Sequence, residues 1–428
     1  MQERILSFVG ILVLLGLSWA FSTDRRKVRP RVILWGLGLQ FAFALLILKT
    51  EAGRFTFAAL NDLILALLDC SQEGARFVFG NLTESVLPVV SDSATAERPS
   101  GLIVRTGSFF AFSVLPTIIF FSAFMAILYH LGVMQRVVSG IAWVMSRTMR
   151  TSGPESLSCA ANIFVGQTEA PLVIRPYIST MSLSELHTVM VGGFATVAGG
   201  VMAAYVGFLH QEIPQIAGHL MAASIMSAPA AIVISKVLLP ETAPVDHGKA
   251  MLAGGLDRNI IDAAARGALE GLTLALNVGA MLIAFLALVT LVNQLLGSLG
   301  TTLGLEELSL AYLFGKLFSP LAFVLGVPWQ DCAEMGSLLG TKVMVNEFVA
   351  YLDLQALLSK GAITERTALI ATYALCGFAN VGSIGIQLGG IGGLAPERRQ
   401  DLAGLGVRAM IAGAFASFST ACIAGILL

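Results

Sequence analysis

Two carboxylates stand inside apolar stretches of the chain, where a charged side chain is costly. Glu169 lies in the run GQTEAP at 166–171, and Glu347 lies in the run NEFVAY at 346–351. An ionisable group in a membrane-spanning region costs about 2.5–3.5 kcal/mol on insertion scales, so such groups are functional by default. An ionised carboxylate only accepts hydrogen bonds, which suits a neutral ligand with several hydroxyl and N–H donors. The alternative is a structural ion pair, which for Glu347 would use Lys342.

Uncharged polar side chains accompany the two carboxylates. Gln167, Asn380 and Ser383 both donate and accept hydrogen bonds, as a ligand with mixed edges requires. Asn162 and Thr196 offer neutral oxygen atoms, which suit a monovalent cation such as sodium when backbone carbonyls complete the site. The alternative for these side chains is hydrogen bonding between helices, worth about 0.6–2 kcal/mol in a membrane.

An aromatic residue, Phe378, lies two positions before Asn380. Its ring could stack on a planar base, and the alternative is packing in the core. Five cysteines show no metal-ligand spacing, so we interpret them as packing residues. Metalloprotease, nucleophile-elbow and Walker-type motifs are absent from the sequence, which argues against an enzyme and leaves an ion gradient as the energy source.

Composition places these residues in a membrane protein. Of 428 residues, 56% are hydrophobic and 12% are charged, and the mean hydropathy is +0.81. Soluble domains carry about 25% charged residues, so half that share indicates a lipid-facing surface. A net charge of −1 without a long basic run gives no indication of a nucleic-acid partner.

Apolar runs of about 18 residues or more mark spanning helices. They predict an all-α polytopic membrane protein with eight transmembrane helices, at 5–21, 32–48, 109–131, 187–209, 219–239, 272–296, 367–389 and 404–428. The loop at 24–31 carries five Lys or Arg against one Asp, which predicts that this loop is cytoplasmic. Eight crossings then leave both termini outside. A cleaved signal peptide does not fit residues 1–22, because the basic cluster follows the apolar run.

Other apolar stretches do not read as simple spans. The stretches at 156–178 and 336–357 have polar centres and are too short to cross twice, so we predict two re-entrant hairpins. The segment 310–327 contains a lysine and a proline and is left unassigned. Residues 51–108 are expected to hold an amphipathic helix around 57–69 and a polar loop at 91–101.

An internal repeat connects the two hairpins. NIFVG at 162–166 returns as NEFVA at 346–350, and GFATV at 193–197 returns as GFANV at 377–381. Both pairs are offset by 184 positions, with seven identities in ten. The predicted loops give the two copies opposite orientations, an inverted repeat typical of secondary transporters that bind substrate and coupling ion near the midplane.

The repeat suggests a division of the chain. We expect scaffold helices at 1–150, consisting of three spans with amphipathic helices. A first transport unit would occupy 151–245, and an amphipathic linker with a long spanning helix would occupy 246–330. The second transport unit would occupy 331–428.

The motifs around the polar residues resemble the concentrative nucleoside transporter family. They are GQTEAPL at 166–172, the glycine, x, lysine, three-residue, NEFVAY pattern at 340–351, and CGFANVGS at 376–383. The resemblance implies a homotrimer with one transport path per subunit that moves nucleosides together with sodium. Some relatives use protons, so proton-coupled symport stays as an alternative.

The resemblance also implies roles for individual residues. The nucleobase would bind to Gln167, Thr168 and Glu169, with Val201 and Phe378 against it. The ribose would bind to Glu347, Asn380 and Ser383. Sodium would bind to the side chains of Asn162 and Thr196 and to the carbonyls of Val165 and Val197. Some relatives have serine at position 196, so threonine keeps the oxygen but crowds the site. Some also have serine where this chain has Gly382, which bears on the choice between purines and pyrimidines.

Two functions of other classes are alternatives to transport coupled to an ion. A passive channel would conduct only down a gradient, and a membrane-embedded enzyme would use the carboxylates as acid and base. The compact length without long polar tails favours the plasma membrane of a prokaryote, that is, its inner membrane.

Overall fold

Helices make up nearly all of the structure. The computed structural model describes residues 2–84, 86–90, 99–105, 110–243, 257–305 and 308–428. The leading helices are α1 (Gln2–Ala20), α2 (Pro30–Lys49), α3 (Glu51–Phe79), α4 (Phe110–Ser113), α5 (Leu115–His130) and α6 (Val133–Met149). The middle helices are α7 (Gly153–Ala161), α8 (Ala170–Val173), α9 (Leu183–Ala195), α10 (Gly199–Leu209), α11 (Ile216–Leu238) and α12 (Ile260–Leu303).

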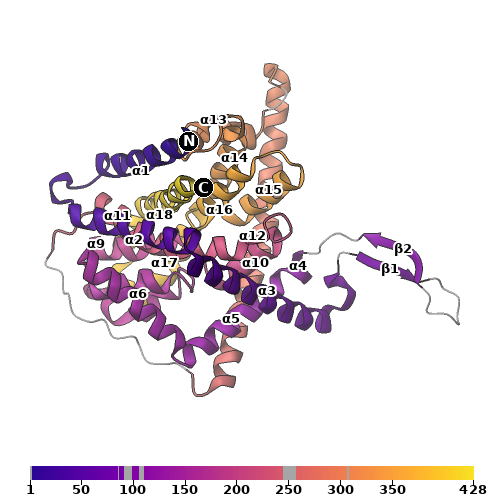
Figure 1. The fold of residues 1–428 in the computed structure, drawn as a ribbon, viewed down its shortest axis with the longest axis horizontal. Helices are drawn as coiled ribbons and strands as arrows, with labels where there is room; N and C mark the ends of the chain where they lie inside the picture. Colours follow the sequence, from indigo (N-terminus) through magenta and orange to yellow (C-terminus); the bar gives the residue numbers. More distant parts are fainter. Residues whose placement is uncertain (1, 85, 91–98, 106–109, 244–256, 306–307) are drawn as a thin grey trace.

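The last part of the chain is again built from short and long helices. They are α13 (Leu310–Val324), α14 (Cys332–Met344), α15 (Glu347–Ser359), α16 (Glu365–Leu375), α17 (Val381–Leu394) and α18 (Arg399–Leu427). Short 3₁₀ turns connect several of them: η1 (Arg25–Lys27), η2 (Gly80–Thr83), η3 (Arg175–Thr180), η4 (Trp329–Asp331) and η5 (Pro396–Arg398). The predicted helical class is confirmed (Figure 1).

One short segment departs from helix. β1 (Val86–Val90) pairs with β2 (Pro99–Arg105) in an antiparallel hairpin that projects from the bundle (Figure 1). This hairpin was not predicted from the sequence. The polar loop predicted at 91–101 falls mostly between the strands, where 91–98 lie outside the described residues, and its last three residues belong to β2.

Seven helical segments in the described residues are long and apolar enough to cross a membrane. They are Gln2–Ala20, Pro30–Ile47, Phe110–His130, Leu183–Leu209, Ile216–Leu238, Ile260–Thr302 and Pro396–Leu427. These match seven of the eight predicted spans. The predicted span at 367–389 is interrupted between α16 and α17. The unassigned segment at 310–327 is the shorter apolar helix α13.

Gly377 explains the interruption between α16 and α17. Its φ is +134°, which residues with a Cβ rarely adopt. A Cβ at this position would also lie 2.7 Å from the Phe194 carbonyl oxygen. Hydropathy averaged over 367–389 did not reveal the break, although Asn380 and Ser383 beside it are polar.

Small residues bring the long helices together. A Cβ built on Gly36 of α2 would meet Val233 of α11, and one on Gly271 of α12 would meet Ile119 and Ser122 of α5. Such close approach is typical of helix packing in lipid. The leading spans therefore have different neighbours: α1 and α2 lie against α18 and α11, whereas α5 lies along α12.

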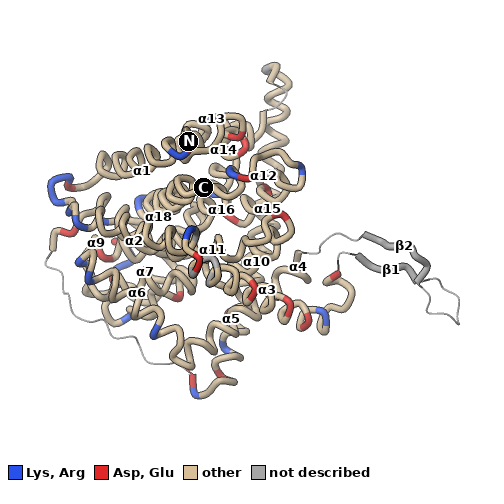
Figure 2. The backbone as a smooth tube through the Cα atoms, viewed as in Figure 1, with Lys and Arg blue, Asp and Glu red and all other residues tan. Residues whose placement is uncertain are grey.

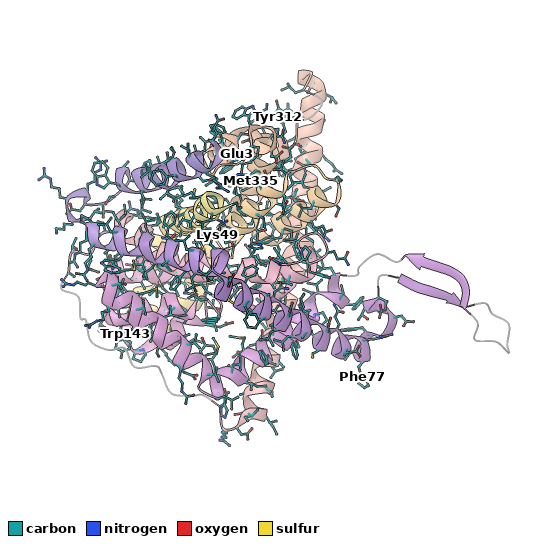
Figure 3. All side chains as sticks on the ribbon, in the orientation of Figure 1. Glu3, Lys49, Phe77, Trp143, Tyr312 and Met335 are labelled. Carbon is teal, nitrogen blue, oxygen red and sulfur yellow. The ribbon has the colours of Figure 1, made fainter. Side chains whose placement is uncertain are left out.

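Two amphipathic helices border the bundle. Helix α3 is longer than the predicted helix at 57–69, and α6 buries Val138 and Met145 on one side. Phe77 of α3 and Trp143 of α6 are exposed and point away from the bundle (Figure 3). Basic residues colour the connection between α1 and α2 (Figure 2), as the sequence of that loop requires.

Candidate functional site

The polar residues singled out above lie where helices stop. Four interruptions are involved: between α7 and α8, between α9 and α10, between α14 and α15, and between α16 and α17. Backbone N–H and C=O groups at helix ends lack partners within the helix, so such places can bind polar ligands and ions. Each predicted site residue lies in one of these four interruptions or in the first turn that follows.

Glu347 is held at the start of α15. It follows Asn346, whose Oδ1 caps the helix by accepting from the Val349 N–H at 2.9 Å. The buried carboxylate accepts from Asn380 Nδ2 at 2.8 Å and from the Tyr205 hydroxyl at 3.1 Å. The helix N-terminus adds a favourable field for negative charge. The structure therefore places a fixed acceptor group in an otherwise apolar interior.

Lys342 does not supply the ion pair considered as an alternative for Glu347. Its Nζ donates to the Ala374 carbonyl oxygen at 2.7 Å and lies 5.4 Å from the centroid of the Phe418 ring. Both contacts belong to the interior around α16 and α18. Glu347 is left to its two neutral donors, so both carboxylate oxygens have further capacity to accept.

Tyr205 of α10 is a neighbour of Glu347 that the sequence analysis missed. Its ring centroid lies 4.3 Å from that of Tyr351 and 4.9 Å from that of Phe348. A tyrosine in an apolar span needs a partner for its hydroxyl, which was the available signal. Its partner lies 142 positions away, so the pairing could not be read from the sequence.

Replacing Tyr205 by phenylalanine should raise the KM for a ribose-containing ligand about fivefold. The change removes one hydrogen bond to the Glu347 carboxylate, worth about 1 kcal/mol, and leaves the ring packing intact. Uptake rates over a range of substrate concentrations measure the effect. Tyr373→Phe is the matched control, because Tyr373 bonds His219 instead of Glu347. Equal KM values in wild type and Tyr205→Phe would show that Tyr205 does not position the carboxylate.

Asn380 and Ser383 lie together at the start of α17. Asn380 Oδ1 caps this helix by accepting from the Ser383 N–H at 2.8 Å, while its Nδ2 reaches Glu347. The Ser383 hydroxyl accepts from Gln167 Nε2 at 3.2 Å. The structure thus brings together four of the predicted residues, Glu347, Asn380, Ser383 and Gln167, from segments far apart in the sequence.

The turn between α7 and α8 supplies the other predicted polar groups. Glu169 Oε2 accepts from the Gly166 N–H at 2.8 Å, which holds the carboxylate against its own turn. Thr168 packs on α17, because a Cβ at Gly390 would lie 2.6 Å from Thr168 Cγ2. Val201 and Phe378 are buried, in the first turn of α10 and in the break before α17.

Asn162 has the features of a cation ligand. It caps the end of α7 and is buried, and neither its Oδ1 nor its Nδ2 has a hydrogen-bond partner among the residues that the structure describes. Thr196 Oγ1 donates to the Gly192 carbonyl at 2.9 Å, and a Cβ at Gly192 would lie 3.3 Å from Asn162 Nδ2. Asn162 and the end of α9 are therefore neighbours.

The two backbone positions predicted for sodium lie in the same region. Val165 follows α7, and the Phe164 carbonyl before it accepts from the Gly199 N–H at 3.0 Å, which joins this turn to the start of α10. Val197 is buried in the break between α9 and α10. Neutral oxygen atoms around an unsatisfied amide fit a monovalent cation, and the C-terminal ends of α7 and α9 add partial negative charge.

Comparison with known proteins gives three family matches along the chain. Residues 9–82 match a family described as the N-terminus of Na+ dependent nucleoside transporters, and residues 219–425 match the corresponding C-terminus. Residues 111–212 match a family described as a nucleoside recognition gate. Together the matches include all four helix interruptions.

Individual relatives agree over almost the whole chain. A sodium/nucleoside cotransporter 1 of Rattus norvegicus is 43% identical over 444 residues, covering 99% of this chain, which spans 64% of the length of the rat protein. An uncharacterised transporter of Haemophilus influenzae is 42% identical, with 99% of this chain and 97% of the relative covered.

Solved structures show the same architecture. The inward-facing, substrate-bound state of CNTnw superposes with a TM-score of 0.88 at 40% identity, covering 99% of this chain and 97% of the other. A variant of CNTnw in an outward-facing state superposes with a TM-score of 0.89 over the same shares.

Proposed function

The chain belongs to the family of Na+ dependent nucleoside transporters, and from this premise we propose that it carries nucleosides into the cell by sodium-coupled symport with alternating access. The family is one of transporters and not of enzymes. The observation that carries the substrate assignment is the buried Glu347 carboxylate, held by Asn380 and Tyr205 with acceptor capacity to spare. Ribose hydroxyls are the donors that such a group suits.

The remaining residues divide between the two halves of a nucleoside. Asn380 and Ser383 would join Glu347 on the ribose, because all three meet at the starts of α15 and α17. Gln167, Thr168 and Glu169 would address the base, with Val201 and Phe378 as its apolar walls. Support comes from the bond between Gln167 and Ser383, which makes the two groups of residues adjacent.

Sodium is the proposed coupling ion and travels as a co-substrate. Asn162 and Thr196 would bind it through side-chain oxygens, with the carbonyls of Val165 and Val197. The unpartnered amide of Asn162 favours this site over purely structural hydrogen bonding. One positive charge moving inward at 100 mV releases about 2.3 kcal/mol, enough for accumulation of several tens of times. Proton-coupled symport is the second candidate.

The proposed architecture follows the repeat. We propose eight crossings with both termini outside, and re-entrant hairpins formed by α7 with α8 and by α14 with α15. The breaks after α9 and α16 support an inverted repeat, because Thr196 and Asn380 hold equivalent places in them, 184 positions apart. The protein would be a homotrimer in a prokaryotic plasma membrane.

The moving and fixed parts are also proposals. The first transport unit would be 151–245 and the second 331–428, joined through 246–330, with scaffold helices at 1–150. Within this scheme, α1 and α2 lie on α18 and α11 of the transport units, so packing favours their moving with these units. The fixed part would then consist of α5 and α12, which lie along each other. Movement of the two units against α5 and α12 would expose the ligand to either side.

Radiolabelled uridine or adenosine uptake into proteoliposomes tests the function. Accumulation should require an inward sodium gradient and should decline in Asn162→Ala, because the cation loses an oxygen ligand. We expect the sodium concentration for half-maximal uptake to rise at least about tenfold, the effect of losing one good ligand group. Asn277→Ala on α12 is a control in another helix for loss of an asparagine side chain.

Three other results would redirect the proposal. Accumulation driven by a proton gradient alone would keep nucleoside transport and remove the sodium site. Uptake that only equilibrates across the membrane would indicate a passive channel. A wild-type protein that takes up neither uridine nor adenosine would contradict the substrate class.

A further inference from the structure

Gln387 of α17 contacts Gln167, one of the proposed base-binding residues, and is not itself among them. We propose that Gln387 is a positioning residue that fixes the amide of Gln167 with its N–H group toward the ligand, so that the base must present a hydrogen-bond acceptor there. This inference rests on the proposed nucleoside transport. It specifies which kind of group on the base, a hydrogen-bond acceptor, Gln167 recognises.

The orientation of the Gln387 amide is set by the backbone. Its Nε2 donates to the Met190 carbonyl oxygen of α9 at 3.0 Å. A carbonyl oxygen only accepts, so the nitrogen and not the oxygen of Gln387 must face it. This matters because the two ends of a side-chain amide are otherwise assigned only from their partners. The side chain is fully buried, and its Oε1 has no hydrogen-bond partner among the residues that the structure describes.

Gln387 passes this orientation on to Gln167. The same Nε2 donates to Gln167 Oε1 at 3.1 Å. Since the oxygen of Gln167 faces Gln387, its nitrogen must point the other way, where Nε2 lies 3.2 Å from the Ser383 hydroxyl oxygen. A reversed Gln167 would set its nitrogen against the nitrogen of Gln387, leaving two donors facing each other.

Gly193 makes room for the pair of amides. A Cβ at this position would lie 2.7 Å from Gln387 Nε2 and 2.9 Å from the Cβ of Gln167. Helix α9 therefore contributes both the acceptor that orients Gln387 and the space in which the two side chains meet. Turning either amide by 180° would break these hydrogen bonds, so the hydrogen bonds fix both orientations.

The consequence is a defined pattern of donors and acceptors. Gln167 offers an N–H group, and Ser383 can turn its hydroxyl to follow the ligand. Glu169, whose Oε2 is engaged by the Gly166 N–H, offers acceptor positions on the same turn. A base edge with an acceptor beside an N–H donor complements this pair. Uracil, cytosine and adenine each carry such an edge.

The inference is tested by the inhibition constants of nucleoside analogues that compete with uptake of a labelled nucleoside. In each pair of competitors one base acceptor is removed or weakened: cytidine with 3-deazacytidine and adenosine with its 1-, 3- and 7-deaza forms lose a ring nitrogen, and uridine with 2-thio- and 4-thiouridine exchanges a carbonyl oxygen for a weaker sulfur acceptor. In the wild type, at least one pair should differ about tenfold in inhibition constant, the value of one buried hydrogen bond with its unpaired partner. In Gln387→Met that difference should fall below about twofold, because the freed Gln167 amide can turn either end to the ligand.

Controls separate positioning from damage. The ratio between a nucleoside and its 3′-deoxy form reports on the ribose side and should be unchanged in Gln387→Met. Leu388→Met, next to it on α17, should change neither ratio. Gln167→Met and the double variant should have the same inhibition constants, because Gln387 acts only through Gln167.

The outcomes are distinct. A base ratio in Gln387→Met equal to that of the wild type overturns the inference, and so does a double variant whose losses simply add. Absence of any sensitive acceptor pair in the wild type also overturns it, because Gln167 would then not donate to the base. A wild-type protein that transports no nucleoside refutes the proposed function instead.

Discussion

Glu347→Ala is expected to lower the kcat/KM of nucleoside uptake by at least about a hundredfold. A hydrogen bond to an ionised group contributes about 1.5–3 kcal/mol, and two ribose hydroxyls on this carboxylate would together provide 3 kcal/mol or more. Each 1.4 kcal/mol corresponds to a factor of ten. The loss should be larger than for any single neutral side chain of the site, because Asn380 Nδ2 and the Tyr205 hydroxyl also lose their shared acceptor.

Glu347→Gln separates charge from shape in this experiment. The amide keeps the volume of the side chain but replaces one acceptor oxygen by a donor, so uptake should still fall at least about tenfold. Thermal unfolding in detergent shows whether each variant is folded. A 2′,3′-dideoxynucleoside lacks the hydroxyls in question and should lose much less on mutation. Equal losses for ribo- and dideoxynucleosides would mean that Glu347 does not bind the sugar.

Asp353→Asn is a matched control for the loss of a carboxylate on the same helix. Asp353 lies in α15, about two turns after Glu347, and is exposed. Uptake by this variant should stay within about twofold of wild type, since surface substitutions change stability by less than about 0.5 kcal/mol. A loss as large as that of Glu347→Ala would indicate a general effect on the hairpin.

Hydropathy predicted eight spans, and seven of them coincide with long apolar helical segments of the described residues, because a membrane demands long apolar helices. The predicted span at 367–389 is broken between α16 and α17, where Gly377 has a positive φ, just as the predicted span at 187–209 is broken between α9 and α10. The β1–β2 hairpin had a readable signal, since two short runs rich in Val and Ile flank a polar loop at 91–98.

The candidate site was predictable as a set of residues but not as a set of contacts. Glu347, Asn380, Ser383 and Gln167 were singled out as polar groups at membrane depth, and the structure brings them together. Gln387 was missed because its partner Gln167 lies 220 positions away. A lone glutamine in an apolar helix is a weak signal, because it can also hydrogen-bond between helices without any ligand.

Joining α5 to α10 by a disulfide is expected to abolish uptake reversibly. A Cβ at Gly200 of α10 would lie 3.4 Å from the Ser122 Oγ of α5, close to the distance between a Cβ and the partner sulfur in a disulfide. The Gly200→Cys/Ser122→Cys protein, in a Cys70→Ser background because Cys70 is the exposed cysteine, should cross-link on oxidation. If α10 moves against α5 during transport, the cross-link stops every cycle, and a reductant restores uptake.

A second pair within one transport unit decides whether movement is the cause. A Cβ at Gly406 of α18 would lie 2.8 Å from Ile384 Cγ2 of α17, so Gly406→Cys/Ile384→Cys should also cross-link. Because α17 and α18 pack on each other inside the second unit, oxidation of this pair should leave uptake intact. The single variants Gly200→Cys and Ser122→Cys must transport normally. A protein fully cross-linked between α5 and α10 that still accumulates nucleoside would place the moving boundary elsewhere, since transport would then proceed with these two helices fixed to each other.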